Sequence, residues 1–451
     1  MDAVRFITGL AVFALVLLAP RSAVGQEHHP APSPADSAAA ADSVAMMPPG
    51  PLGEPRTREG SGTAWLPDAT PMYALHGQAG PWELMLHGSL YVHYLDDGGD
   101  RGREEFGATN WVMGMGRRPV LGGDLTLRAM LSADPLTAGE CGYPDLLATG
   151  EFCDGEPLHD QQHPHDLFME LVGIYERALT GNLALQLYGG PVGEPALGPV
   201  AFPHRISSFP NPIAPISHHW LDSTHIAFGV ATAGIYGRRW KAEGSLFNGR
   251  EPDAERYNID LDPLDSYSGR LWLLPNERWA LQVSAGQLNE AEVHEPGGVP
   301  IDVTRMTASA TYHRSLTREG HWSSTLAWGR NREGSEATQA FLVETNFNLA
   351  ERDLFYGRLE VAEKTGGDLV LPEELEEESF NVSKLGLGYV RQFSPLAGFV
   401  PGAGAGVTVS RVPDDLESFY GSRFPTGLQL FLRLRPAPMP SGEHAIEEHA
   451  Q

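Results

Sequence analysis

The stretch WELMLHGSLYVH, residues 82–93, alternates apolar and polar side chains over most of its length. Successive residues of a β-strand point to opposite faces, so the stretch has an apolar and a polar face. The apolar face carries Trp82, Leu84, Leu86, Leu90 and Val92. The polar face carries Glu83, His87, Ser89 and His93. Apolar residues facing lipid and polar residues facing a lumen are typical of a transmembrane β-barrel.

The same pattern continues along the chain in segments of about ten residues that are separated by turn residues. We count about 16 such segments, which is a common size for bacterial outer-membrane barrels. They begin near Trp82, Thr109, Leu125, Asp166, Asn182, His225, Arg239, Asp265, Arg278, Thr304, His321, Ala337, Asp353, Asn381, Gly398 and Phe424.

The connections between these segments alternate between short and long. The short ones are near residues 179–181, 237–238, 275–277, 317–319, 350–352 and 394–396. The long ones are near 96–107, 134–164, 190–223, 248–264, 289–302, 331–336, 364–379 and 411–423. Outer-membrane barrels have short periplasmic turns and longer extracellular loops. We therefore predict an all-β fold over residues 63–435, a transmembrane antiparallel up-and-down barrel of about 16 strands.

Aromatic residues at strand starts indicate the position of the membrane, because rings at one depth form an interfacial girdle. They are Trp82, Trp240, Trp279, Trp322, Phe355 and Phe399. In the last strand we expect Leu428 and Leu432 to face lipid and Arg433 to face the lumen. In the strand after residue 225, we expect Ile226, Phe228 and Val230 to face lipid. Its small residues, Ala227 to Ala233, would then line the inner wall.

The composition is consistent with this fold. The 451 residues include 51 Gly and 36 Pro, both of which break helix interiors. A net charge of -26 argues against nucleic acid as a partner, because phosphate binding requires Lys and Arg patches. The expected partners are outer-membrane lipid and small-molecule or cation solutes, with a homo-oligomer as a further expectation.

The N-terminus predicts export to the cell outer membrane. Residues 1–25 have the charged, apolar and small-residue regions of a secretory signal peptide. Residues 26–62 are rich in Pro, Ala, Ser and Asp, which predicts a disordered periplasmic tether. Residues 436–451 form a polar C-terminal tail. In an exported protein, Cys141 and Cys153 are expected to form a disulfide, with a metal-binding pair as the alternative.

The loops 134–164 and 190–223 are unusually long and contain few flexible linker residues. Loops of this length are usually functional or disordered, and the prolines here limit disorder. We expect at least one of them to fold into the lumen and narrow it. The residues predicted to line the lumen or its constriction are Glu83, His87, His93, Glu194, Arg205 and Arg433.

Histidines gather in these two loops and at the ends of their flanking strands, and imidazole is the commonest metal ligand near neutral pH. The candidate ligands are His159, His163, His165, His218, His219, Asp222 and His225. Cleavage before Gln26 would also place His28 third in the mature chain, with His29 beside it. An amine, two amides and that imidazole form a square-planar nitrogen set, which suits copper or nickel.

No motif indicates an enzyme, because the sequence contains no Gly-x-Ser-x-Gly, phosphate-loop or dinucleotide-binding pattern. Three blocks do resemble a family of predicted bacterial outer-membrane proteins. They are LYGGPVGEPALGP (187–199), HHWLDSTHIAFGVATAG (218–234) and SLFNGREPD (245–253). The resemblance spans roughly residues 60–435 and implies an association with heavy-metal handling, particularly of copper. No activity is assigned to that family, so no site residues can be transferred from it.

Two functions remain open from the sequence. The first is a porin-like channel for small solutes or cations that two long loops constrict. The second is a surface or periplasmic protein that binds a transition metal such as copper as part of a resistance system.

Overall fold

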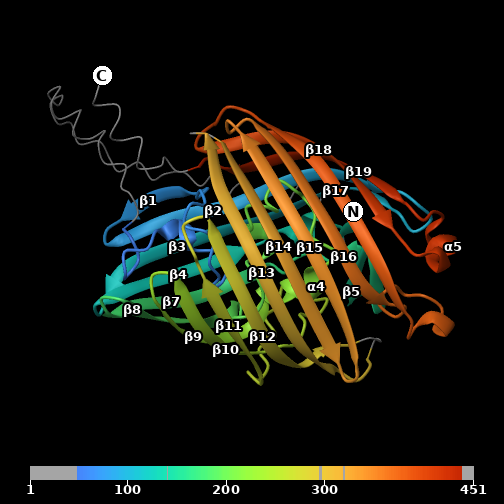
Figure 1. The fold of residues 1–451 in the computed structure, drawn as a ribbon, viewed down its shortest axis with the longest axis horizontal. Helices are drawn as coiled ribbons and strands as arrows, with labels where there is room; N and C mark the ends of the chain where they lie inside the picture. Colours follow the sequence, from blue (N-terminus) through green and yellow to red (C-terminus); the bar gives the residue numbers. More distant parts are fainter. Residues whose placement is uncertain (1–47, 140, 294–296, 318–319, 439–451) are drawn as a thin grey trace.

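The computed structural model describes residues 48–139, 141–293, 297–317 and 320–438. Sixteen antiparallel strands form a closed barrel (Figure 1). These strands are β2 (Trp82–Asp97), β3 (Glu104–Val120), β4 (Gly123–Leu131), β7 (Phe168–Thr180), β8 (Leu183–Gly193), β9 (Ala227–Tyr236), β10 (Trp240–Phe247), β11 (Ser266–Leu273), β12 (Trp279–Glu292), β13 (Ile301–Thr317), β14 (Gly320–Glu333), β15 (Glu336–Leu349), β16 (Asp353–Thr365), β17 (Ser379–Gln392), β18 (Phe399–Arg411) and β19 (Thr426–Pro436).

Pairing between the last strand and the first closes the barrel. β19 runs antiparallel to β2 from Gly427 opposite Asp97 to Leu434 opposite Leu90. The remaining edge of β2 pairs with β1 (Leu75–Ala79), a short strand that the sequence did not predict. Closure leaves no unpaired strand edge in lipid, where an unsatisfied backbone amide costs several kcal/mol. The predicted fold class is confirmed, and each predicted strand start lies within five residues of an observed one.

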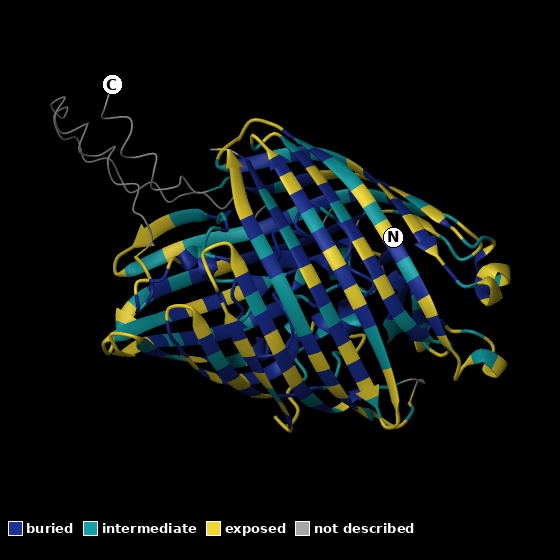
Figure 2. Cartoon of the chain, in the orientation of Figure 1, coloured by how far each residue is buried: buried dark blue, intermediate teal, exposed yellow. Residues whose placement is uncertain are grey.

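The exterior is apolar where the alternating pattern predicted it. Leu428, Leu430 and Leu432 are exposed in β19, whereas Gln429 and Arg433 between them are buried. Figure 2 shows this alternation as a chequered pattern along the front strands. The aromatic residues Trp240, Trp279 and Phe355 are exposed at strand starts, as a girdle requires. Phe399 differs, because it is buried, with Pro436 opposite it in the register of β18 and β19.

Two further details of the prediction are wrong. The expected long loop at 331–336 is a two-residue turn, Gly334-Ser335, between β14 and β15. The predicted faces of β9 are also reversed. Ala231, Ala233 and Ile235 are exposed, whereas Phe228 and Val230 are buried inside. The inner wall is apolar here because Phe228 and Val230 pack against residues of the second long loop, Ile206 and Leu197 among them.

Short elements lie in the connections. They are α3 (Asp134–Thr137), β5 (Tyr143–Cys153), β6 (Glu156–Gln162), α4 (His218–Leu221), α5 (Glu417–Tyr420) and the 3-10 turns η1 (Arg56–Arg58), η2 (Phe202–His204), η3 (Ser223–His225), η4 (Glu373–Leu375) and η5 (Asp414–Leu416). Among the described residues, none of these helices is long and apolar enough to cross a membrane.

Candidate functional site: the filled lumen

Three chain segments occupy the lumen, and the first is the N-terminal segment 48–74. Arg56 pairs with Asp124 of β4 and Glu176 of β7, each at 2.9 Å. Glu59 accepts a hydrogen bond of 2.8 Å from Arg117 of β3. The predicted tether therefore does not extend over residues 48–62, which carry enough buried Arg and Glu to dock on the wall. Residues 1–25, expected to be a signal peptide, lie outside the described residues, as do residues 26–47 of the expected tether and 439–451 of the tail.

The second segment is the long connection 194–226, which the sequence predicted as the loop 190–223. Its Arg205 is fully buried and lies between two carboxylates. The guanidinium is 2.5 Å from Asp222 of the same loop and 2.9 Å from Glu344 of β15. Glu344 also accepts a hydrogen bond of 2.9 Å from Arg358 of β16. The loop thus starts at β8 and docks on strands β15 and β16, which lie elsewhere in the ring.

Polar contacts continue along this loop and reach other inward-facing side chains. Arg358 donates to Ile213 O at 2.9 Å and to Ser208 Oγ at 2.7 Å. Ser217 donates to Glu360 at 2.7 Å, and Trp220 Nε1 donates to Thr338 at 2.9 Å. In Figure 1, α4 of this loop is seen behind β15 and β16. Docking by hydrogen bonds satisfies the polar backbone that a buried loop carries.

The third segment is the connection between β4 and β7, which contains the hairpin of β5 and β6. Cys141 and Cys153 form the predicted disulfide across it. Asp145 pairs with Lys384 of β17 at 2.5 Å, and Thr149 accepts a hydrogen bond of 2.5 Å from Lys364 of β16. The hairpin therefore contacts β16 and β17 near their extracellular ends.

The six residues predicted to line the lumen or its constriction have different surroundings. Glu194 pairs with Arg270 of β11 at 3.4 Å, and Arg433 donates to Gln392 at 2.8 Å. His93 is buried, with its ring 5.8 Å from that of Tyr143. His87 contacts Trp111 and His204, while Glu83 lies near the periplasmic end and is half-buried. Polar groups that would line open water in a wide pore are here covered by protein.

The structure brings five of the predicted histidines into one chain of ring contacts. Centroid separations are 6.2 Å for His163 and His219, 5.7 Å for His219 and His218, 5.2 Å for His218 and His225, and 5.4 Å for His225 and His165. His159 lies apart and contacts its neighbour Asp160 at 2.8 Å. His28 and His29 are outside the described residues.

All five imidazoles have an oxygen near Nδ1: His163 faces the carbonyl of Pro164 at 3.2 Å and His219 faces Glu251 at 3.3 Å. The other three contacts are shorter. His165 faces Asp134 at 2.7 Å, His218 faces Asp222 at 2.8 Å, and His225 faces the carbonyl of Asp222 at 2.8 Å. Such oxygens only accept hydrogen bonds, so Nδ1 carries the proton in each neutral ring. This leaves Nε2 with a free electron pair, as in histidines that ligate metals. Asp222 itself is already shared between His218 and Arg205.

His219 belongs to a different arrangement. It lies with Glu251 and Glu292 so that their possible ligand atoms are all within 4.8 Å of one another. Of the described candidates from the sequence, only His219 belongs to a group of this kind that is free of the disulfide. Arg305 lies 3.9 Å from Glu292 and partly balances the two carboxylates.

Burial sets the protonation of the loop residues. It lowers the pKa of His218 to about 4, although the hydrogen bond to Asp222 opposes this shift. It raises the pKa of Glu194 to about 7, against the opposing charge of Arg270. At neutral pH the central histidine is therefore uncharged, and its Nε2 can act as a ligand.

Several residues of this site were missed from the sequence: Glu344, Arg358, Arg270, Glu251 and Glu292. Glu344 carried a usable signal, because it alternates with the outward-facing Phe341 and Val343 along β15 and therefore points inward. Its partner Arg205 is 139 residues away in a loop. The alternation along a strand predicts which way a side chain points, but it does not predict which loop residue that side chain will contact.

The sequence matches no protein-family model, and no curated protein is significantly similar to it. Similar solved structures include Salmonella typhi OmpF in complex with daunomycin, at TM-score 0.48 and 7% identity over 80% of this chain and 100% of that chain. The anion-selective porin from Comamonas acidovorans has a TM-score of 0.46 and 12% identity, covering 78% and 99% of the two chains. The outer membrane channel DcaP of Acinetobacter baumannii has a TM-score of 0.45 and 9% identity, covering 81% and 100%. These likenesses are weak, so the assignment as an outer-membrane barrel rests on the closed strand pairing and the apolar exterior.

Proposed function

We propose that the protein is a porin-like outer-membrane channel for small solutes whose own internal segments constrict and gate it. The observation that carries the proposal is the docking of Arg205 between Asp222 and Glu344. Closed barrels of about 16 strands are wide enough for an aqueous channel. A chain segment held across such a lumen limits what passes.

The character of the docking surface favours a gate over a permanent filling. Besides its apolar packing on Phe228 and Val230 of β9, the loop meets β14 to β16 through ion pairs and hydroxyl contacts such as Ser207 with Thr325, at 2.7 Å. Water can replace such contacts when the loop moves, whereas a purely apolar interface would strongly resist hydration. Acidic side chains at the extracellular end, Glu373 to Glu378 in particular, favour cations among the solutes.

Locking the loop to the wall tests the gate. The hydroxyls of Ser207 and Thr325 are close enough for a disulfide to replace them, so we expect the Ser207→Cys/Thr325→Cys variant to cross-link on oxidation. Oxidation should lower permeation of a small sugar and of K⁺ into proteoliposomes at least tenfold, and reduction should restore it. Liposome swelling and planar-bilayer current measure the two solutes.

The matched control shares one substitution. Thr311→Cys/Thr325→Cys joins two directly opposed residues of β13 and β14, whose Oγ1 atoms are 3.2 Å apart. It removes the same Thr325 contact but forms no cross-link between the loop and the wall. Its permeation should not respond to oxidation. Wild type under the same reductant controls for the native disulfide. Equal permeation of the oxidised and reduced loop variant, or no permeation by wild type, would overturn the proposal.

The group formed by His219, Glu251 and Glu292 favours a second candidate function, binding of a divalent transition metal. One imidazole and two carboxylates within 4.8 Å match the nitrogen and oxygen ligands that Zn²⁺ accepts. This candidate deepens the metal hypothesis from the sequence and narrows it to one histidine of the predicted set.

We expect Zn²⁺ to bind the folded protein and His219→Gln to weaken that binding by tenfold or more. The reason is that the imidazole is the only nitrogen ligand of the group. Isothermal titration in detergent measures the affinity. His159→Gln is the control, since that ring contacts Asp160 away from the group. Unchanged Zn²⁺ affinity in His219→Gln would remove this site.

A further inference from the structure

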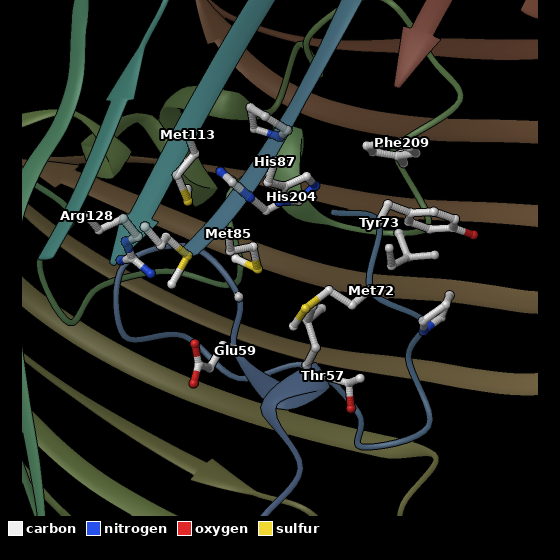
Figure 3. A pocket seen from close by; sticks show the side chains of 16 residues that line it. Thr57, Glu59, Met72, Tyr73, Met85, His87, Met113, Arg128, His204 and Phe209 are labelled. Carbon is white, nitrogen blue, oxygen red and sulfur yellow. The ribbon is translucent and has the colours of Figure 1, made fainter. Parts of the chain in front are cut away.

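A cavity separate from the histidine chain lies between the wall and two of the internal segments (Figure 3). The wall contributes side chains from β2 and β3, the N-terminal segment contributes Met72, and the loop 194–226 contributes His204. The cavity is thus assembled from the wall, the N-terminal segment and the loop 194–226.

Four methionines line this cavity: Met72, Met85, Met113 and Met115. The strand register explains three of them. Met85 of β2 lies directly opposite Met115 of β3, and His87 lies directly opposite Met113. Directly opposed residues have Cβ atoms about 5 Å apart on the same face of a sheet, so the three thioethers and the imidazole form one inward patch. Figure 3 shows Met72 facing this patch from the N-terminal segment.

Two imidazoles complete the donor set. The ring of His204 lies 4.6 Å from that of Trp111 and 5.8 Å from that of His87. His87 Nε2 is buried and has no hydrogen-bond partner. An imidazole nitrogen that carries no proton offers an electron pair to a metal ion.

The charged residues of the cavity are already paired and do not form part of this donor set. Glu59 is held by Arg117 and Arg56, and Arg128 is held by Glu170 at 2.5 Å. The groups that remain available are neutral sulfur and nitrogen atoms. Soft thioether and imidazole ligands select monovalent copper over Mg²⁺, Ca²⁺ or Mn²⁺, which prefer oxygen.

Methionine also fills irregular gaps in cores, so packing alone is the competing explanation. Met130 and Met169 serve that purpose in the same apolar cluster without lining the cavity. Packing does not account for a buried imidazole nitrogen without a partner, because burying such a group unsatisfied costs free energy. A bound cation would satisfy it.

We propose that this cavity is a binding site for a soft monovalent cation, Cu(I), for which Ag(I) is a redox-inert substitute. The ligands come from Met85, Met113, Met115 and His87 on the wall, with Met72 and His204 closing the site from the internal segments. The proposal is independent of channel activity, because it needs only the cavity as it stands.

The test is Ag(I) titration of the folded, detergent-solubilised full chain in chloride-free buffer, with anaerobic Cu(I) competition against a chromophoric chelator. The Met85→Leu/Met113→Leu variant removes two sulfur atoms while nearly conserving side-chain volume. We expect it to bind Ag(I) and Cu(I) at least tenfold more weakly than wild type. Met130→Leu/Met169→Leu is the matched control, and its affinity should be unchanged. X-ray absorption of the Cu(I) complex should show sulfur together with nitrogen neighbours.

Three results would overturn the proposal. One is equal affinity of the two double variants. Another is that wild type binds Ag(I) no more tightly than the Met85→Leu/Met113→Leu/His87→Gln variant, provided that this variant retains the circular-dichroism spectrum of the barrel. The third is displacement of Ag(I) by equimolar Zn²⁺, which would assign the binding to nitrogen and oxygen ligands elsewhere. Ligands common to all variants, such as the N-terminal histidines, cancel in these comparisons.

Discussion

Removing the two internal segments 48–70 and 197–221 should raise the conductance of the barrel by at least tenfold. Arg117 and Glu176, which Arg56 and Glu59 cover, would then face water, as would Glu344 and Arg358. A closed ring of about 16 strands needs no filling to stay closed, because the hydrogen bonds between strands hold it. Planar-bilayer recordings of the double deletion should therefore show large, long-lived open events.

Two further proteins define the outcome. Each single deletion shows which segment is the greater barrier, and we expect both to conduct less than the double deletion. A folded double deletion with the conductance of wild type would show that neither segment blocks the lumen.

The substitution Arg205→Ala should undock the second loop. It leaves Asp222 with His218 and Glu344 with Arg358, so two buried carboxylates each lose their shared guanidinium. Breaking a buried ion pair from one side costs about 3–5 kcal/mol. Amide hydrogen exchange in residues 200–225 should accelerate by two orders of magnitude or more, while the barrel strands should remain protected.

Arg250→Ala is the control for that effect. Arg250 also bridges two carboxylates, Asp265 and Glu290, but it lies at the surface. Exposed pairs contribute about 0–1 kcal/mol, so exchange in the second loop should not change. Arg205→Lys keeps the positive charge but lacks the several N–H donors of the guanidinium. Amide exchange in residues 200–225 should therefore be faster than in wild type and slower than in Arg205→Ala. Protection of residues 200–225 equal to wild type in Arg205→Ala would mean that the ion pairs do not hold the loop.

Local rules were enough to predict the wall of this protein. Alternation with a period of two set the faces of β2 and β19, and the parity of the connections set the antiparallel order. Each rule concerns residues that are neighbours in sequence or face one uniform medium. Lipid is such a medium, so Leu428 and Leu432 could be placed outside without knowledge of any partner.

The interior could not be predicted in the same way, because its side chains face other parts of the chain and not a uniform surrounding such as lipid. Phe228 and Val230 looked like lipid-facing residues, yet they meet Ile206 and Leu197 of a loop. Residues before Gly62 looked like a solvated tether, yet Arg56 finds carboxylates on β4 and β7. The histidines of the loops could be named as a group, but their separation into a chain of rings and one group with Glu251 and Glu292 required coordinates.

The contacts of the N-terminal segment also constrain the order of assembly. Tyr73 lies under the guanidinium of Arg435, 3.9 Å from ring centroid to Cζ, on the last strand of the barrel. Arg56, Glu59 and Glu54 meanwhile reach β4, β3 and β9. The part of the chain that leaves the ribosome early therefore has no complete docking surface until the final strand has joined the first. Seating of this segment is a late event in biogenesis, and a barrel caught before it would be closed as a ring but still unfilled at its periplasmic end.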